Sequence, residues 1–101
     1  MDKELYQQKA EIFKALANPV RLEVIDTLLN GEKCVCEIQD ALSKYEQPHI
    51  SKSLSKLKAA GLIKDRRNGM NVYYSLAICC MSELFECLNK ILQEDQDKAC
   101  S

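Results

Sequence analysis

Six cysteines in a chain of 101 residues are the side chains with the most reactive chemistry. Cys34 and Cys36 are separated by one residue, and Cys79, Cys80 and Cys87 form a second cluster. The first ten residues are polar and charged and lack the apolar stretch of a signal peptide, and no apolar run is long enough for a membrane span. We therefore expect a cytoplasmic protein. In that reducing compartment, thiolates favour binding of a soft metal ion or redox sensing over structural disulfides.

The charged side chains are distributed unevenly along the chain. The net charge of the whole chain is −1, but residues 44–67 carry +5 and the remainder carries −6. Only a local basic surface has to meet phosphate groups, so a nearly neutral chain is compatible with nucleic-acid binding. The seven basic residues of this segment are Lys44, Lys52, Lys56, Lys58, Lys64, Arg66 and Arg67.

The spacing of apolar residues and the turn signals predict the elements that position these groups. Asn18-Pro19 is typical of the start of a helix, and Asn30-Gly31 is typical of the end of that helix. Asn68-Gly69 favours a hairpin turn. Further helices are expected over residues 4–17, 35–42, 47–60 and 78–94, and strands over 62–66 and 72–76. The order ααααββα predicts a single mainly α domain with a small β-hairpin (α+β), a winged helix-turn-helix over residues 1–101. Residues from about 95 to 101 are expected to form a disordered tail.

The fourth predicted helix has a polar face that its apolar stripe leaves free. An α-helix fits the major groove of DNA, where amide, imidazole, hydroxyl and ammonium groups can bond base edges. The hairpin offers arginines to the backbone or minor groove, and such contacts position a protein without specifying sequence. We therefore expect double-stranded operator DNA as the partner. The candidate DNA-binding residues are Gln47, His49, Ser51, Lys52, Ser55, Lys56, Arg66 and Arg67.

Several strings of residues resemble the ArsR/SmtB family of metalloregulatory repressors. Phe13-Lys-Ala-Leu-Ala-Asn-Pro-Val-Arg-Leu22 is similar to the opening helix pair of that family. Gln47-Pro48-His-Ile-Ser51-Lys-Ser-Leu54 is similar to its recognition helix, and Val72-Tyr73-Tyr74-Ser-Leu76 to part of its wing. The match covers residues 10–90. It implies a homodimer built on the first and last helices, operator binding without inducer, and release when a soft metal or metalloid binds.

Two positions depart from the pattern of the family. Glu46 stands where the family usually has Ser, which weakens the N-cap of the recognition helix and puts a negative charge near DNA. Ser53 stands where the family often has His. Both changes are expected to alter the preferred operator sequence without removing DNA binding.

The string Cys34-Val-Cys36-Glu-Ile38 is similar to the sensing motif of arsenic, cadmium and lead responders in this family. The resemblance implies As(III), or another thiophilic ion, as the inducer, bound to Cys34 and Cys36 as the first-choice site. A helix start is expected to lower the pKa of these thiols. Some arsenic sensors carry a third cysteine where this chain has Gln39, so the pair needs a further donor.

Cys79, Cys80 and Cys87 resemble a second arsenic-sensing arrangement of the same family and are the second-choice site. Cys80 and Cys87 can also serve as small apolar residues, because both lie on the apolar stripe of the predicted last helix. Seven residues of straight helix separate them by ~10 Å, which is too far for one small ion unless the helix end unwinds or a neighbouring subunit contributes a donor. Cys100 is a possible extra donor.

Two other functions stay open. One is a redox or persulfide sensor of the same fold, and the other is a winged-helix protein-interaction module with structural zinc. An enzyme is not expected, because no phosphate-binding glycine loop and no Ser–His or His–carboxylate pairing stands out.

Overall fold

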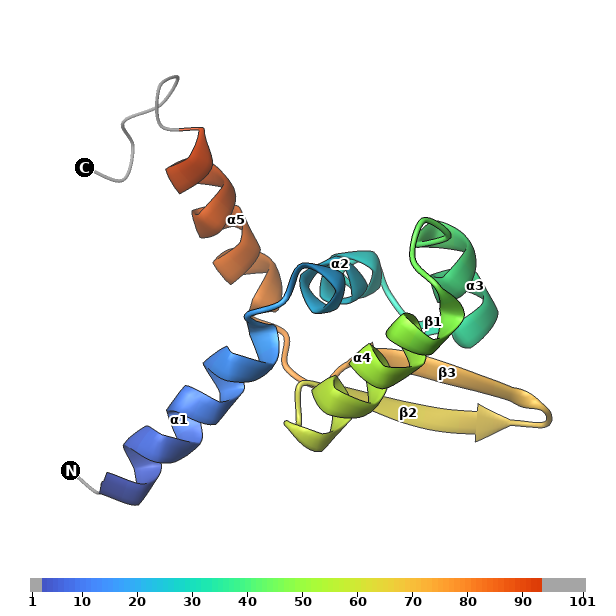
Figure 1. The fold of residues 1–101 in the computed structure, drawn as a ribbon, viewed down its shortest axis with the longest axis horizontal. Helices are drawn as coiled ribbons and strands as arrows, with labels where there is room; N and C mark the ends of the chain where they lie inside the picture. The colour runs from blue at the N-terminus through green and yellow to red at the C-terminus, as the bar shows by residue number, and fades with distance from the viewer. Residues whose placement is uncertain (1–2, 94–101) are drawn as a thin grey trace.

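The computed structural model describes residues 3–93, in which the middle helices lie beside a small sheet and the first and last helices project away from it (Figure 1). In the described residues, no helix is both long and apolar enough to span a membrane. The predicted disordered tail and Cys100 lie outside them. In chain order the elements are α1 (Lys3–Leu16), α2 (Pro19–Leu28), β1 (Lys33–Cys34), α3 (Val35–Ala41), α4 (Gln47–Ala59), β2 (Ile63–Asn68), β3 (Asn71–Leu76) and α5 (Met81–Leu92).

Side-chain and glycine signals set the ends of three elements. The side-chain oxygen of Asn18 accepts hydrogen bonds from the backbone N–H groups of Val20 (2.9 Å) and Arg21 (3.3 Å), so it caps α2. Gly61 follows α4 with a φ of +81°, the left-handed conformation that commonly ends a helix. Gly69 opens the two-residue turn between β2 and β3 with a φ of +66°, as a type II′ hairpin requires.

The predicted hairpin has a third strand beside it. Lys33 pairs with Tyr74 and Cys34 with Tyr73 in antiparallel register, which gives a sheet of order β1-β3-β2. The predicted element order ααααββα therefore lacked one element. A strand of two residues is too short to show the alternation of apolar and polar positions that identifies strands in a sequence.

The hydrophobic core lies where α2, α3 and α4 meet. Ile25, Ile38, Ile50 and Leu57 are each at most 1% exposed and belong to one cluster of buried side chains. Burying an aliphatic side chain of this size contributes about 1.5–3 kcal/mol relative to leaving it in water. These contacts fix the inward face of α4 and thereby decide which of its residues face solvent.

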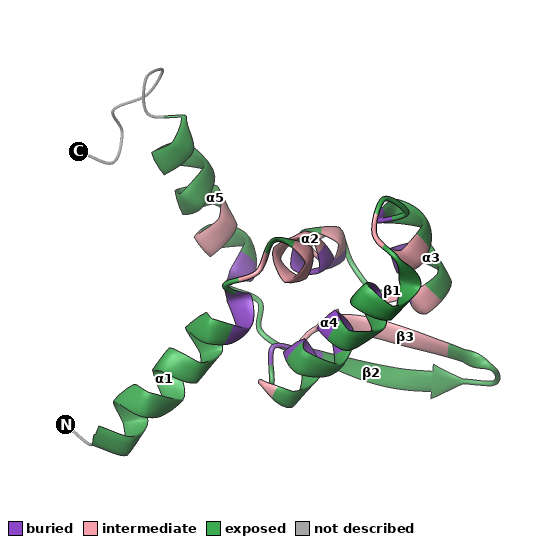
Figure 2. Ribbon diagram, in the orientation of Figure 1, coloured by how far each residue is buried: buried purple, intermediate pink, exposed green. Residues whose placement is uncertain are grey.

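The helices α1 and α5 extend away from this core, and most of their surface is exposed (Figure 2). Ala15 and Leu16 are the buried residues of α1, and Met81 is that of α5. The last helix begins at Met81 and not at residue 78 as predicted, because the chain turns after β3 before Met81 docks on the core. Cys79 and Cys80 therefore precede the helix and do not lie on its apolar face.

A polar cluster holds the connection between α3 and α4. Glu23 of α2 accepts a hydrogen bond from the Tyr45 hydroxyl and forms a 3.0 Å ion pair with the Lys44 ammonium group. The hydrogen bond from Tyr45, followed by that from Lys44, lowers the pKa of the Glu23 carboxyl. The chain that leads into α4 is thus tied directly to α2.

The cap of α2 gives a stability prediction. We expect Asn18→Ala to lower the free energy of unfolding by about 1 kcal/mol, because two backbone donors lose their acceptor. Urea titration at one fixed protein concentration measures the change. Asn18→Asp keeps a side-chain acceptor and serves as the control, so an equal loss of stability in both variants would contradict the capping role.

Candidate nucleic-acid interface and thiol pair

The outward face of α4 carries the predicted DNA-reading side chains. Ile50, Leu54 and Leu57 are buried on the opposite face, which leaves the polar positions between them free. Glu46 is the N-cap residue, but its side chain accepts no hydrogen bond from the backbone N–H groups at the start of α4. All six predicted residues of this helix are exposed: Gln47, His49, Ser51, Lys52, Ser55 and Lys56.

A shallow groove of about 240 Å³ runs between the start of α2 and α4. His49, Lys52 and Lys56 line one side of it, and Arg21 lines the other. Ser53, where the family often has His, is only 7% exposed and lies in this groove and not on the outermost face of the helix. Sequence reasoning missed Arg21, although its place in the first turn after Asn18-Pro19 was a usable signal.

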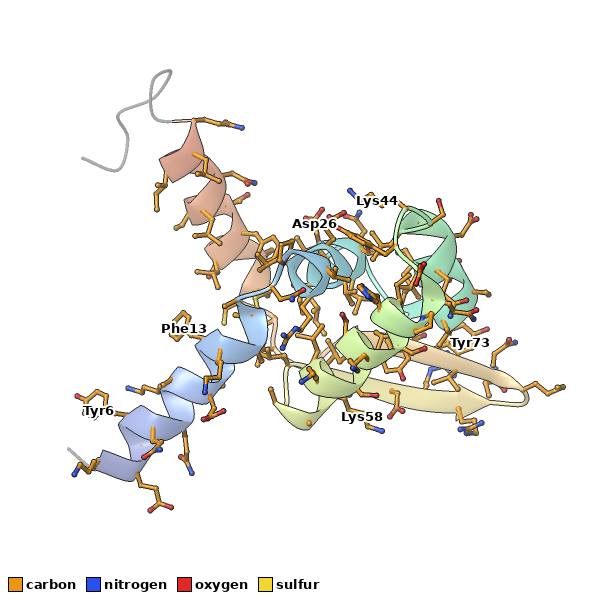
Figure 3. All side chains as sticks on the ribbon, in the orientation of Figure 1. Tyr6, Phe13, Asp26, Lys44, Lys58 and Tyr73 are labelled. Atoms are coloured by element: carbon orange, nitrogen blue, oxygen red, sulfur yellow. The ribbon has the colours of Figure 1, made fainter. Side chains whose placement is uncertain are left out.

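Within residues 3–93, the basic residues of segment 44–67 divide into two groups. Lys44 and Lys58, both labelled in Figure 3, and Arg66 are engaged by Glu23, Asp65 and Glu32 in ion pairs of 2.8–3.0 Å. The other four form no ion pair or side-chain hydrogen bond with the described residues. These unpaired cations, available to phosphate, are Lys52, Lys56, Lys64 and Arg67.

Arg66 is held in a specific geometry on the wing, the hairpin of β2 and β3. Its Nε and one terminal nitrogen donate to the two carboxylate oxygens of Glu32 at 2.8 and 2.9 Å. Its guanidinium group also lies 4.7 Å from the centre of the Tyr73 ring. The Arg66 hydrogen bonds lower the pKa of the Glu32 carboxyl. The two predicted arginines therefore differ, since Arg67 is exposed and unpaired in the described chain while Arg66 is already bound.

The first predicted thiol pair lies at the junction of β1 and α3. Cys34 is buried and is the N-cap residue of α3, and Cys36 is exposed in its first turn. The Glu37 carboxylate accepts a 2.9 Å hydrogen bond from the backbone N–H of Cys34, which fixes the start of the helix. The two Sγ atoms are 2.6 Å apart, so the motif brings both sulfurs to one place.

The neighbouring sulfur changes the acidity of Cys36. The hydrogen bond with Cys34, followed by desolvation, raises the pKa of the Cys36 thiol, whereas backbone hydrogen bonds at the helix start lower it less strongly. The expectation that the helix start lowers the pKa of this thiol was therefore wrong for Cys36. The hydrogen bond with the neighbouring thiol and the loss of water around the sulfur outweigh the backbone N–H groups at the helix start.

No described cluster of three or more Cys, His, Asp or Glu side chains is arranged to hold a metal ion. Cys34 and Cys36 fit a thiophilic ion as a two-sulfur chelate. Cys79, Cys80 and Cys87 are all exposed, and the turn before α5 separates the first two from the helix that carries the third. They are not assembled into one site within residues 3–93, and Cys100 lies outside the described residues.

Comparison with known proteins gives the family of the chain. The family "Bacterial regulatory protein, arsR family" matches residues 18–65. The arsenical resistance operon repressor of Staphylococcus xylosus is 32% identical over 94% of this chain and 90% of its own length. A transcriptional repressor SmtB homolog of Synechocystis is 42% identical over 87% of this chain and 66% of its own length.

Solved structures share the fold over nearly the whole chain. The crystal structure of Rv0081 from Mycobacterium tuberculosis has a TM-score of 0.80 at 30% identity and covers 99% of this chain and 100% of that one. The homodimeric winged helix-turn-helix DNA-binding domain Mb0332 of Mycobacterium bovis has a TM-score of 0.77 at 34% identity, with coverages of 93% and 86%. The chain belongs to the ArsR/SmtB family of winged helix-turn-helix transcriptional regulators.

Proposed function

We propose that the chain is a homodimeric cytoplasmic repressor that releases its operator when As(III), or another soft ion such as Cd(II) or Pb(II), binds Cys34 and Cys36. The observation that carries this proposal is a vicinal thiol pair at the start of α3, the helix directly before α4. The relatives named as an arsenical resistance operon repressor and an SmtB homolog support a metal-responsive role.

The contact with DNA follows from the surface of α4 and the wing. The unpaired cations Lys52 and Lys56 lie on the exposed polar face of α4, Lys64 and Arg67 lie on β2 of the wing, and Arg21 adds a further cation across the groove. Phosphate contacts of this kind release condensed counterions and supply affinity, while base-edge contacts from α4 supply specificity. We therefore assign base readout to Gln47, His49, Ser51 and Ser55, and phosphate contacts to the lysines and Arg67.

The dimer is proposed to form through α1 and α5. These helices hold most of the exposed large apolar side chains: Leu5, Tyr6, Ile12 and Phe13 on α1, and Leu88, Ile91 and Leu92 on α5. Tyr6 and Phe13 stand on the side of α1 that faces away from the core (Figure 3). A second copy would cover this surface, and the similar Mb0332 domain is itself homodimeric. Two recognition helices are then available for half-sites about 34–36 Å apart.

The thiol chemistry explains how two cysteines can suffice. Arsenite in water is As(OH)₃, and two thiols can replace two hydroxides, each thiol proton leaving with a hydroxide as water. One hydroxide stays on arsenic, so a third cysteine is not required. Metal–sulfur bonds are ~2.3 Å long, so two sulfurs reach one ion only when both side chains point to it. Chelation would therefore fix the sulfurs of Cys34 and Cys36 on a single ion and restrict both side chains.

This restriction acts on the start of α3. Cys34 is the N-cap residue, and its backbone N–H is tied to Glu37, so a displaced sulfur strains the first turn. Ile38 on the same helix packs in the core with Ile50 of α4. A shift of α3 therefore changes the support of the recognition helix and lowers operator affinity.

Operator binding is tested by its dependence on salt. We expect the slope of log K against log [salt] to be steep and Lys52→Ala to reduce its magnitude by about one, because one phosphate contact is lost. Fluorescence anisotropy at several salt concentrations measures it. Lys3→Ala, which removes the same charge from the far end of α1, should leave the slope unchanged. An affinity for DNA that does not change with salt concentration would favour the alternative function, a winged-helix protein-interaction module.

Sensing is tested by separating the two cysteine clusters. Under reducing conditions, we expect Cys34→Ser with Cys36→Ser to abolish arsenite-induced release from DNA. The triple change Cys79→Ser, Cys80→Ser and Cys87→Ser should retain it. The opposite pattern would place sensing in the second cluster. Release by oxidant alone, with no response to arsenite, would establish the redox alternative.

Dimer formation is tested by a charge in the apolar surface. Phe13→Glu puts a carboxylate at a side chain that is 65% exposed in one chain and that we expect to be covered in the dimer. Light scattering should then give the chain mass of 11.5 kDa instead of twice that value. Met70→Glu, at the 98% exposed wing tip, is the matched control and should stay dimeric. A dimeric Phe13→Glu protein would contradict the assignment.

A further inference from the structure

The buried thiol of the pair lies in the same cross-strand row as the wing arginine. In the sheet register, Cys34 of β1 is opposite Tyr73 of β3, and Tyr73 is opposite Arg66 of β2. Directly opposed residues in antiparallel strands project from the same face of a sheet. The guanidinium group of Arg66 contacts the Tyr73 ring, so these two members of the row are joined by side chains as well as by backbone pairing.

A second contact closes this row into a ring. Arg66 donates both of its hydrogen bonds to Glu32, which is two residues before Cys34 in the same stretch of chain. The path from Cys34 to Tyr73, to Arg66, to Glu32 and back to Cys34 is therefore continuous. Bidentate guanidinium–carboxylate pairs and stacking on an aromatic ring are strongly directional, so the ring has a defined geometry.

The adjacent cross-strand row of the sheet contacts other parts of the structure. Lys33, Tyr74 and Asp65 are opposite one another, and Tyr74 packs against the core cluster. Asp65 accepts a 3.0 Å hydrogen bond from Lys58 at the end of α4. One row is therefore tied to the core and to α4, whereas the row of Cys34 is tied to the loop before β1.

We propose that Glu32, Arg66 and Tyr73 form a latch through which the state of Cys34 and Cys36 sets the position of the wing. Arg66 is then a positioning residue of the wing, and Arg67 carries the phosphate contact. The proposal rests on the proposed function, because it gives the thiol site a second route to DNA beside the one through α3.

The physical basis is that β1 alone is a weak attachment. It pairs with β3 through only Lys33 and Cys34, so little backbone pairing holds the thiol segment to the wing. The latch adds a fixed point on the other side of Cys34. When an ion binds both sulfurs and moves Cys34, the displacement reaches Glu32 along the chain and Tyr73 across the sheet, and both act on Arg66. Without the latch, the wing is uncoupled from the thiols.

The test uses full-length protein in which Cys79, Cys80, Cys87 and Cys100 are serine, so that arsenite meets only the thiol pair. The measured quantity is the ratio of operator dissociation constants with and without arsenite. We expect Glu32→Gln to change the arsenite-free constant less than threefold and to reduce the ratio at least fivefold. Arsenic–thiolate absorption in the near ultraviolet should be unchanged, because the sulfurs are intact.

Two further variants separate the latch from simpler roles. Arg66→Lys keeps the positive charge that a phosphate contact needs but loses the bidentate geometry and the planar stack, so the ratio should fall as in Glu32→Gln. Asp65→Asn removes the comparable ion pair of the neighbouring row and should leave the ratio at the parent value. In the NMR spectrum of the four-serine parent protein without DNA, arsenite should shift the backbone amide signal of Gly69 at the wing tip. Glu32→Gln should suppress that shift.

The outcomes separate the latch from the proposed function. Absence of arsenite binding in the parent would contradict the proposed function and the latch with it. Arsenite binding and release that are equal in the parent, Glu32→Gln and Arg66→Lys would overturn the latch alone. A weaker operator complex with an unchanged ratio would also overturn it, because it would reveal a purely structural role.

Discussion

The burial of Ile38, Ile50 and Leu57 where α2, α3 and α4 meet is the constraint on which the other features depend. A chain of this size has a small core, so a few close-packed side chains carry much of its stability. Their packing fixes the rotation of α4 about its axis, and this rotation presents its polar side chains to solvent. Because α3 and α4 contribute side chains to the same core, a shift of α3 also changes the position of the α4 surface that is proposed to read DNA.

Electrostatics divides the basic segment by function. Arg66, Lys58 and Lys44 are bound by carboxylates that hold the wing and the connection before α4, whereas the remaining cations face solvent. Exposed ion pairs contribute little to stability on average, so their role here is to position neighbouring elements. The acidic residues outside the segment thus do two things: they lower the net charge of the chain, and Glu23 and Glu32 orient parts of the proposed interface.

Cys34 and Cys36 lie where the strand that pairs with the wing meets the helix that contributes to the core. Cys34 belongs to β1, which pairs with the wing, and it is also the N-cap residue of α3, whose Ile38 shares the core cluster with residues of α4. A ligand held by both sulfurs would act on both elements at once, because they meet at one residue. The apolar surfaces of α1 and α5 would hold two chains together in the proposed dimer. The distance between the two α4 helices would then be fixed, so a shift of each α4 would change the fit to an operator with two half-sites.

The sequence alone determined the helices, the hairpin, the family resemblance and the polar face of α4, because periodicity, caps and turn residues are local signals. It also placed Cys34 and Cys36 two residues apart at the start of a predicted helix, although their sulfurs meet only because Cys34 keeps an extended backbone before the first turn. Tertiary structure decided what depends on contacts between distant segments. The strand β1 exists only through its pairing with β3, Arg66 is bound by a carboxylate 34 positions away, and Cys79 and Cys80 precede α5 because Met81 docks on the core. No local pattern encodes such contacts, because they arise when the packed core brings remote residues to the same place.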